Sequence, residues 1–309
     1  MSRTFFHTVL ASASTMRCLY LLVLVGIAVP TFAEIDREWT TPLPPFPIAD
    51  NLYYVGSREL AAYLVTTPAG NILINANLET SPPQIRANVE KLGFQWAETK
   101  ILLNSQAHFD HMPGAAQILR ETHAKNMVME GDADVVESGG RTDFLAASGS
   151  VPAYPPAHVD RILHDGDTVV LGGATLTAHK TAGHTRGCTT WTFAVHLRGE
   201  PADQLRNVVI VGGTAFWSDF HFLDGSEHKA SYPGIAEDFA RTFRLLRSLP
   251  CDIFLGAHGS YFGFTSKLAR LGEEGPEVFL DAAGYHDYLA RSQADFEAAL
   301  GKERQAAKP

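Results

Sequence analysis

The chain is 309 residues long; 45% of its residues are hydrophobic and 19% are charged. This composition provides enough apolar material for a sizeable core and excludes a disordered or collagen-like chain. The formal net charge of −9 argues against nucleic acid or an anionic membrane surface as a partner.

The first 33 residues predict an export signal rather than part of the fold. Arg17 precedes the uncharged run Cys18–Val29, and small residues follow at the positions that a signal peptidase recognises. We therefore expect a signal peptide over residues 1–33, a mature domain over residues 34–309, and a periplasmic protein without a membrane segment after cleavage. The alternative is an N-terminal anchor that is not cleaved.

Two cysteines, Cys188 and Cys251, remain after this cleavage. Exported proteins often form disulfides, so a single bridge is possible. We expect two free thiols instead, because Cys188 follows the turn of His184 and Cys251 precedes the strand 253–255, so other features of the chain set both positions. The core must then supply the stability, which a mature domain of this length allows.

The first half of the mature domain predicts strands followed by helices. An extended proline-rich arm over 41–47 precedes strands over 52–55, 62–66 and 71–76, a helix over 82–92, a buried strand over 101–104, and a helix from Pro113 to about Thr122.

The second half repeats this arrangement. It predicts strands on either side of the turns 165–167 and 172–173, strands over 188–195, 208–211 and 253–255, a helix over 235–249, and a terminal helix from Pro276 to about Gly301. Strands in both halves with helices attached favour an α/β fold in which two sheets pack face to face with helices outside. Polar chemistry is then expected at strand ends along one edge.

The segment Gln106-Ala-His108-Phe-Asp110-His111 lies in the turn after a buried strand. Alternating positions of an extended segment point to the same side, so several of these side chains can converge. Imidazole and carboxylate groups are ligands that zinc accepts. The alternative is a helix N-terminus that Asp110 caps, with two incidental histidines.

Two further turns present a histidine directly after a strand. One is Thr181-Ala-Gly-His184-Thr-Arg-Gly187 and the other is Gly256-Ala-His258-Gly-Ser260. Three strand-end turns with histidine supply enough ligands for two metal ions, which makes coincidence hard to sustain.

These motifs, together with residues 231–238 and 249–252, resemble the metallo-β-lactamase superfamily, and specifically subclass B3 metallo-β-lactamases, over essentially the whole mature domain. The resemblance implies an αββα sandwich with a shallow active-site groove at one edge of the two sheets. It also implies two zinc sites, the first formed by Gln106, His108 and His184, and the second by Asp110, His111 and His258.

Gln106 departs from the usual motif of the family, which has histidine at this position. The amide oxygen of glutamine is a weaker neutral donor than imidazole, so we expect the first site to lose zinc affinity. A glutamine-bearing group exists within subclass B3. The alternative is that Gln106 only hydrogen-bonds a neighbouring ligand, so the chain is expected to hold one or two zinc ions.

The turn Val211-Gly-Gly213-Thr214 distinguishes among relatives of the same superfamily. Glyoxalase II, lactonases and phosphodiesterases carry an aspartate that bridges the two metals at this turn, and Gly213 has no side chain to do so. Subclasses B1 and B2 use a cysteine ligand near this place, whereas the cysteines of this chain lie elsewhere.

The resemblance implies hydrolysis of the β-lactam ring of penicillins, cephalosporins and carbapenems by metal-bound hydroxide, and hence antibiotic resistance. A metal lowers the pKa of bound water toward about 7, so no nucleophilic serine is needed. Asp110 is the expected catalytic residue, because it binds the second zinc and orients the water. Candidates for binding the substrate carboxylate, each of which could equally be an ordinary loop residue, are Thr214, Ser218, Lys229 and Ser260.

Other functions remain open at this point. Trp217, Phe216 and Phe220 could line the groove, although aromatic residues near strand ends more often belong to packing. The chain could be another zinc hydrolase of this fold, acting on a lactone, thioester or phosphodiester. It could also be a decayed periplasmic zinc-binding protein, against which the intact histidine and aspartate ligands argue. We expect a monomer that acts on a small molecule.

Overall fold

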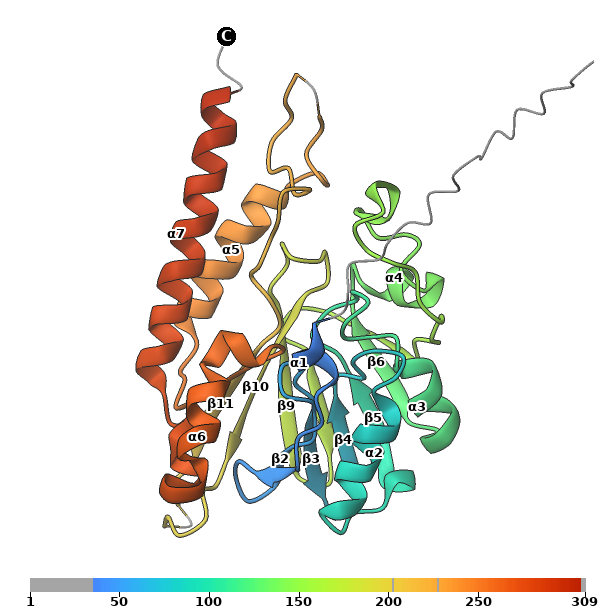
Figure 1. Ribbon diagram of the computed structural model, residues 1–309, viewed down its shortest axis with the longest axis vertical. Coiled ribbons are helices and arrows are strands. Elements are labelled where there is room, and N and C mark those ends of the chain that lie inside the picture. The colour runs from blue at the N-terminus through green and yellow to red at the C-terminus, as the bar shows by residue number, and fades with distance from the viewer. Residues whose placement is uncertain (1–35, 202, 227, 307–309) are drawn as a thin grey trace, which may run out of the picture. The chain divides into compact units, whose positions relative to one another are not determined.

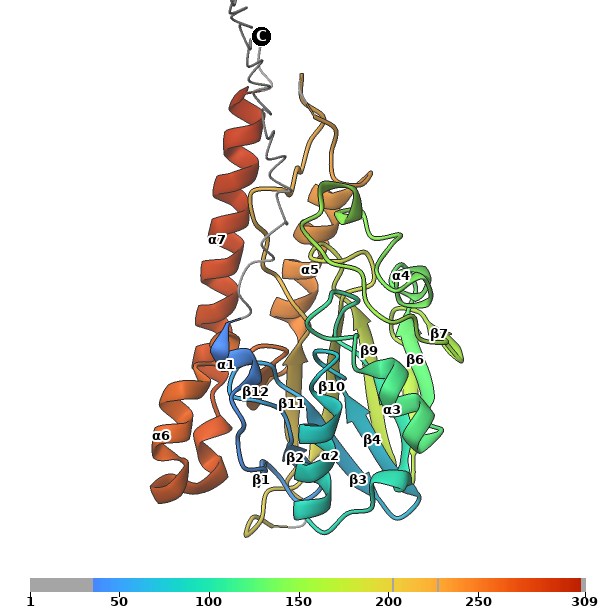
Figure 2. The ribbon, with the colours of Figure 1, turned by 45° about the vertical axis from the view of Figure 1, so that its right-hand side comes forward.

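The computed structural model describes residues 36–201, 203–226 and 228–306 of the chain, which form two β-sheets with helices on their outer faces (Figures 1 and 2). The expected signal peptide over residues 1–33 lies outside the described residues. Among the residues that are described, each helix is too short or too polar to cross a membrane.

The first sheet has seven strands in the order in which they occur along the chain. They are β1 (Phe46–Pro47), β2 (Leu52–Tyr54), β3 (Tyr63–Thr67), β4 (Gly70–Ile74), β5 (Thr99–Leu103), β6 (Lys125–Met129) and β7 (Arg161–Leu163). Strands β1 to β4 pair antiparallel, whereas β4 to β7 pair parallel. The carboxyl ends of the parallel strands therefore meet at one edge.

The second sheet has five strands in the order β12-β11-β10-β9-β8. They are β8 (Thr168–Leu171), β9 (Ala174–Lys180), β10 (Thr189–Val195), β11 (Arg206–Val211) and β12 (Ile253–Gly256). β10 is antiparallel to both of its neighbours and β11 is parallel to β12, so β9, β11 and β12 run in the same direction. Their carboxyl ends therefore also share one edge.

Helices form the two outer layers. They are α1 (Arg37–Thr40), α2 (Pro82–Lys91), α3 (Ala115–Thr122), α4 (Ala133–Ser138), α5 (Ile235–Ser248), α6 (Phe264–Glu274) and α7 (Ala282–Ala306). Helices α2, α3 and α4 pack on the outer face of the first sheet, and α5 and α7 cover the second, as Figure 1 shows. The fold is the expected αββα sandwich.

The main core lies between the two sheets and joins the strands that lead to the polar edge. Tyr63 and Ile74 of the first sheet belong to the same buried cluster as Trp191 and Ile210 of the second. The indole Nε1 of Trp191 donates a hydrogen bond of 2.9 Å to the carbonyl oxygen of Asn104. This bond fixes the end of β5 against the facing sheet, and the candidate metal ligands begin two residues later.

Most of the expected elements are confirmed, and the terminal helix is corrected. This helix begins at Ala282 and not at Pro276, because Gly275–Phe279 forms a separate 3-10 helix. Asp281 accepts a 2.8 Å hydrogen bond from the backbone N–H of Gly284 and so caps the new helix start. The sequence analysis did not predict β6, α4 or α6. The expected free thiols are confirmed, with Cys188 buried and Cys251 half-buried.

Candidate metal centre

The six residues expected to bind metal come from three strand ends along one edge of the sandwich. Gln106, His108, Asp110 and His111 lie in the loop after β5, His184 follows β9, and His258 follows β12. All but His258 are less than 9% exposed, and the His258 side chain is 13% exposed. The structure therefore gathers side chains that are up to 152 residues apart along the chain.

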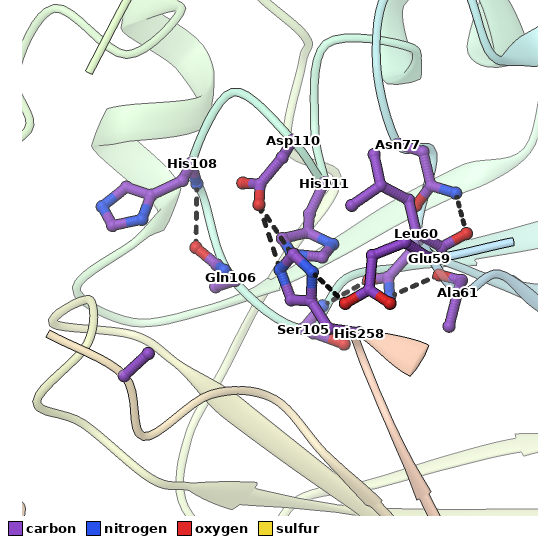
Figure 3. A network of polar contacts seen from close by, with 12 residues as sticks. Glu59, Leu60, Ala61, Asn77, Ser105, Gln106, His108, Asp110, His111 and His258 are labelled. Carbon is purple, nitrogen blue, oxygen red and sulfur yellow. Dashed lines mark hydrogen bonds and ion pairs between the residues drawn. The ribbon is translucent and has the colours of Figure 1, made fainter. Parts of the chain in front are cut away.

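Asp110, His111 and His258, here called the aspartate trio, point at one another (Figure 3). Asp110 Oδ2 lies 3.3 Å from His111 Nε2 and 3.1 Å from His258 Nε2, and the two nitrogens are 3.1 Å apart. Donors about 2.0–2.1 Å from one tetrahedral zinc lie roughly 3.3 Å from each other. The trio therefore fits one face of such a coordination shell.

Gln106, His108 and His184, here called the glutamine trio, fit a metal less completely. His108 Nδ1 lies 3.2 Å from His184 Nε2, which again matches two ligands of one zinc. Gln106 Oε1 instead accepts a long hydrogen bond of 3.4 Å from the backbone N–H of His108, and Gln106 Nε2 is buried without a hydrogen-bond partner in the described structure. The histidine pair is arranged for a metal, whereas the amide is turned toward its own loop.

The interpretation of Asp110 as a helix cap is wrong. Helix α3 starts after Gly114, four residues later, and its first turn receives no side-chain cap. The Asp110 carboxylate faces the two histidine rings instead.

Asp132, at the start of α4, connects the loop after β5 to the turn after β9. Its carboxylate accepts hydrogen bonds from the backbone N–H of Ala107 at 2.9 Å, from Thr185 Oγ1 at 2.8 Å, and from the backbone N–H of Gly187 at 2.7 Å. The side chain is fully buried, and burial raises the pKa of Asp132 to about 6 despite these donors. Both loops of the glutamine trio are thus tied to one buried acid.

The electrostatics of the centre favour metal binding. Burial alone would raise the pKa of Asp110, but His111 and His258 hold it well below its usual range, so the carboxylate is ionised. Burial and the neighbouring His108 lower the pKa of His184 to about 3, which keeps this ring neutral. For His258 burial is outweighed by Asp110 and Glu59, which raise its pKa to about 9, so a metal must displace a proton there.

Three of the histidine rings also contact a group on the side away from the centre. His184 Nδ1 donates to the carbonyl oxygen of Ala215 at 2.6 Å, which fixes Nε2 as the free nitrogen. Asp143 Oδ2 lies 3.5 Å from His108 Nε2, and Glu59 Oε1 lies 3.6 Å from His258 Nδ1; both are ion-pair distances. Partners of this kind orient metal ligands and increase their basicity.

The four candidate substrate-binding residues occupy different surroundings. Thr214 is buried, and its Oγ1 forms a 2.7 Å hydrogen bond with the hydroxyl of Tyr288. Ser218 donates to Asp219, Ser260 donates to Glu59 at 2.5 Å, and Lys229 pairs with Asp224 at 3.2 Å. Thr214 and Tyr288 border a cavity of about 370 Å³ that Tyr261 also lines.

Among Phe216, Trp217 and Phe220, Trp217 contacts both histidine rings of the glutamine trio. Its ring centroid lies 5.8 Å from that of His108 and 5.9 Å from that of His184, and the residue is 37% exposed. Phe220 is buried against Trp217, and Phe216 packs on Phe222 and Phe239. The Phe220 ring also stacks on His184, with centroids 6.3 Å apart, so Trp217 and Phe220 both border the glutamine trio and Phe216 belongs to packing.

Sequence reasoning missed Glu59, Asp132 and Asp143. None of them belongs to a local motif, because each contacts the centre only through residues distant in the chain. A buried acid after a strand, such as Asp132 after β6, is the one signal that could have directed attention to them.

Comparison with known proteins agrees with this geometry. Residues 60–258 match the family model described as the metallo-β-lactamase superfamily. The structure resembles the native FEZ-1 metallo-β-lactamase from Legionella gormanii, with a TM-score of 0.80 and 44% identity over 85% of this chain and 98% of that one. It also resembles the class B3 di-zinc metallo-β-lactamase LRA-12 from an Alaskan soil metagenome, with a TM-score of 0.76 and 37% identity over 86% and 97% of the two chains.

A curated protein, described as a probable metallo-hydrolase of Burkholderia pseudomallei, is 28% identical over 172 residues. These residues are 55% of this chain and 54% of the relative, so the match spans about half the length of that protein. The chain belongs to the metallo-β-lactamase superfamily and is a hydrolase of that superfamily with β-lactamases as structural neighbours.

Proposed function

We propose that this protein is a subclass B3 metallo-β-lactamase that hydrolyses the β-lactam ring of penicillins, cephalosporins and carbapenems with zinc. The observation that carries the proposal is the aspartate trio, whose three donor atoms lie 3.1–3.3 Å apart beside the facing His108–His184 pair. The similarity to FEZ-1 and LRA-12, both described as metallo-β-lactamases, supports the substrate class.

Each proposed ligand has a defined task. Zinc bound by the two trios would supply a Lewis acid that lowers the pKa of water toward about 7 and polarises the scissile amide. His184 and His111 offer neutral nitrogens at neutral pH because burial lowers the pKa of both. Asp110 is the catalytic residue: its carboxylate is ionised and can accept a hydrogen bond from the attacking water, which orients that water toward the lactam carbonyl.

Gln106 is proposed as the weak ligand of the first site. Its side-chain oxygen faces the backbone N–H of His108. Rotation of the amide is therefore needed before the oxygen can bind metal. This supports a first site of lower zinc affinity than the second, with one or two ions held at different zinc concentrations.

Substrate contacts are proposed from the edge of the centre. Thr214 Oγ1 and the Tyr288 hydroxyl share one hydrogen bond, which leaves one hydroxyl proton of the pair to donate to a ligand in the cavity beside the turn that carries Gly213, and Trp217 provides an apolar wall. Ser218, Lys229 and Ser260 stay weaker candidates for the substrate carboxylate, because each already pairs with an acidic side chain.

The runner-up reaction is hydrolysis of a lactone, thioester or phosphodiester. A Cβ atom at Gly213 would lie 3.1 Å from His184 Cδ2, so this position faces the centre. An aspartate here could reach between two metals, and glycine cannot. The position therefore supports the β-lactamase over relatives that use a bridging aspartate.

The remaining proposals concern the export, the location and the biological effect of the protein. We propose that residues 1–33 are a signal peptide, that the mature domain of residues 34–309 is a periplasmic monomer, and that its activity confers resistance to β-lactam antibiotics. The net negative charge and the absence of a membrane-spanning helix among the described residues are compatible with this location.

Hydrolysis of nitrocefin and of a carbapenem by the purified protein tests the function. Zinc is added stepwise to the chelated protein and bound metal is counted in parallel. We expect turnover that appears with zinc and disappears with chelator. Zinc binding without opening of either lactam would overturn the proposal, and lactone and thioester substrates would then identify the actual reaction.

A further inference from the structure

Glu59 lies in the loop between β2 and β3, about 200 residues from His258, yet it contacts the turn that carries this histidine. Its carboxylate accepts hydrogen bonds from the Ser260 hydroxyl at 2.5 Å and from the Ser260 backbone N–H at 3.1 and 3.2 Å. Its own carbonyl oxygen accepts from the backbone N–H of Gly259 at 2.8 Å. Glu59 therefore fixes the turn immediately after His258.

The same carboxylate also faces the His258 ring (Figure 3). Glu59 Oε1 lies 3.6 Å from Nδ1 on one side of the ring, and Asp110 Oδ2 lies 3.1 Å from Nε2 on the other. A backbone bridge between Leu60 and His258 keeps the two segments adjacent. The His258 ring is thus held between two carboxylates, and its Nε2 atom faces the other two members of the aspartate trio.

The charge of Glu59 has no other cationic partner among the described residues. The adjacent Arg58 forms its ion pair with Glu38, at 3.2 Å, and not with Glu59. The Glu59 side chain is 20% exposed, so water screens it only in part. A carboxylate with four-fifths of its side chain withdrawn from solvent needs a compensating partner, and the polar partners of the Glu59 side chain among the described residues are Ser260 and His258.

We propose that Glu59 is a positioning residue that directs the Nε2 atom of His258 toward the second metal site and strengthens metal binding there. An Nδ1 proton on the side that faces the Glu59 carboxylate leaves the Nε2 lone pair free for the metal, which sets both the tautomer and the ring orientation. The inference rests on the proposed function, because it assigns a role to Glu59 at the same centre.

The negative charge of Glu59 adds to this effect. The aspartate trio contains a single carboxylate to balance a divalent cation, and Glu59 brings a second one next to the ring without occupying a coordination position. Outer carboxylates of this kind typically raise metal affinity by about 10- to 100-fold. The second site would therefore depend on a residue that no ligand motif contains.

Glu59→Gln tests the role, because it keeps the shape of the side chain and removes its charge. Zinc affinity is measured by competition with a chromophoric chelator, and the visible spectrum of the cobalt-substituted protein reports on the ligand geometry. We expect one of the bound ions to be held about 10- to 100-fold more weakly, with a changed cobalt spectrum. Glu59→Asp, which keeps the charge at shorter reach, should recover part of the loss.

Glu38→Gln is the matched control. Glu38 lies in α1, its carbonyl oxygen accepts from the backbone N–H of Glu59, and its side chain pairs with Arg58 and not with a candidate ligand. Glu38→Gln removes one negative charge from the same region without touching a candidate ligand. Zinc affinity should therefore stay within about twofold of that of the unsubstituted chain. The thermal unfolding midpoint of each chelated variant separates loss of folding from loss of metal.

The outcomes are distinguishable. If the unsubstituted chain binds no zinc, the proposed function and the positioning role of Glu59 both fail. If it binds zinc and Glu59→Gln binds equally well, or loses no more affinity than Glu38→Gln, the positioning role is wrong while the function stands. If Glu59→Gln does not fold, Glu59→Asp alone is the test. The inference would then be overturned if Glu59→Asp bound zinc as tightly as the unsubstituted chain does.

Discussion

The two groups of candidate ligands occupy the same edge of the sandwich but are held in different ways. In the aspartate trio all three donor atoms already lie within 3.3 Å of each other, and one of them is a carboxylate. In the glutamine trio the two histidines face each other, while the neutral Gln106 is turned to its own backbone. Charge and preorganisation therefore favour the same group, and we expect it to dominate metal binding.

The supports outside the two trios differ as well. Glu59 contacts a ligand ring of the aspartate trio, whereas Asp132 ties the loops of the glutamine trio through Ala107, Thr185 and Gly187. The first support acts on a donor atom, and the second acts on the backbone. Substitutions in one region should therefore alter metal affinity, and substitutions in the other should mainly alter stability.

The largest effect is expected from Asp110→Ala, which removes the carboxylate of the aspartate trio. Zinc affinity and lactam hydrolysis should each fall by more than about 100-fold, because losing a direct ligand exceeds the loss typical for an outer partner. Chelator competition and initial rates check this. Asp50→Ala, an exposed aspartate between β1 and β2, is the control and should leave both quantities unchanged. Similar losses of zinc affinity and activity in both variants would contradict the dominant role of the aspartate trio in metal binding.

Gly183→Ala tests how the glutamine trio is built. Gly183 has φ of +141°, and a Cβ atom would lie 2.8 Å from Phe239 Cδ2, whereas the backbone of His258 is extended with ordinary angles. We expect the substitution to lower the free energy of unfolding by about 3 kcal/mol, from strain and overpacking combined. Urea unfolding of the chelated protein measures it.

Gly272→Ala provides the comparison for that experiment. Gly272 lies in α6, and a Cβ atom there meets no atom within 4 Å. Alanine should stabilise this helix by up to about 1 kcal/mol. Equal destabilisation by both substitutions would mean that the turn before His184 has no special requirement for glycine.

Asp132, which ties the loops of the glutamine trio, should make the free energy of unfolding of the chain depend on pH. Burial raises the pKa of Asp132 to about 6, so the folded state holds the proton more tightly than the unfolded state does. Its contribution to stability is therefore present below about pH 4 and is lost as the pH rises through 6. In Asp132→Asn the free energy of unfolding should fall less over this pH range than in the unsubstituted chain, by about 1–3 kcal/mol. Urea unfolding of both chelated chains at pH 4.5 and pH 7 gives the difference, and parallel declines would contradict it.

The smallest change in metal affinity among the ligand substitutions is expected from Gln106→His. Imidazole is a stronger donor than an amide, so the more weakly held zinc should bind about tenfold more tightly. Titration of the chelated protein with zinc, with turnover recorded at limiting metal, measures this gain. Gln117→His, on the exposed side of α3, is the control and should not change the titration. No gain at Gln106 would indicate that this residue does not bind the metal.

Much of the fold was predictable because it depends on short-range patterns. The strand expected over 71–76 and the helix expected over 82–92 correspond to β4 and α2, since hydrophobic periodicity and the proline start are local signals. The start of α7 was not predictable in the same way. It depends on the cap from Asp281, whose carboxylate is also held by Lys267 of α6 at 2.8 Å.

The sequence by itself determined which residue types stand at the three strand ends, because each motif is contiguous and imidazole and carboxylate side chains are recognisable metal ligands. Only the tertiary structure decided how closely the donors approach one another, that Gln106 turns away, and that Glu59 reaches a turn 201 positions further along the chain. The physical reason is that such contacts depend on how the strands pair and how the two sheets pack. A carboxylate carries no local signal of the ring that it will face.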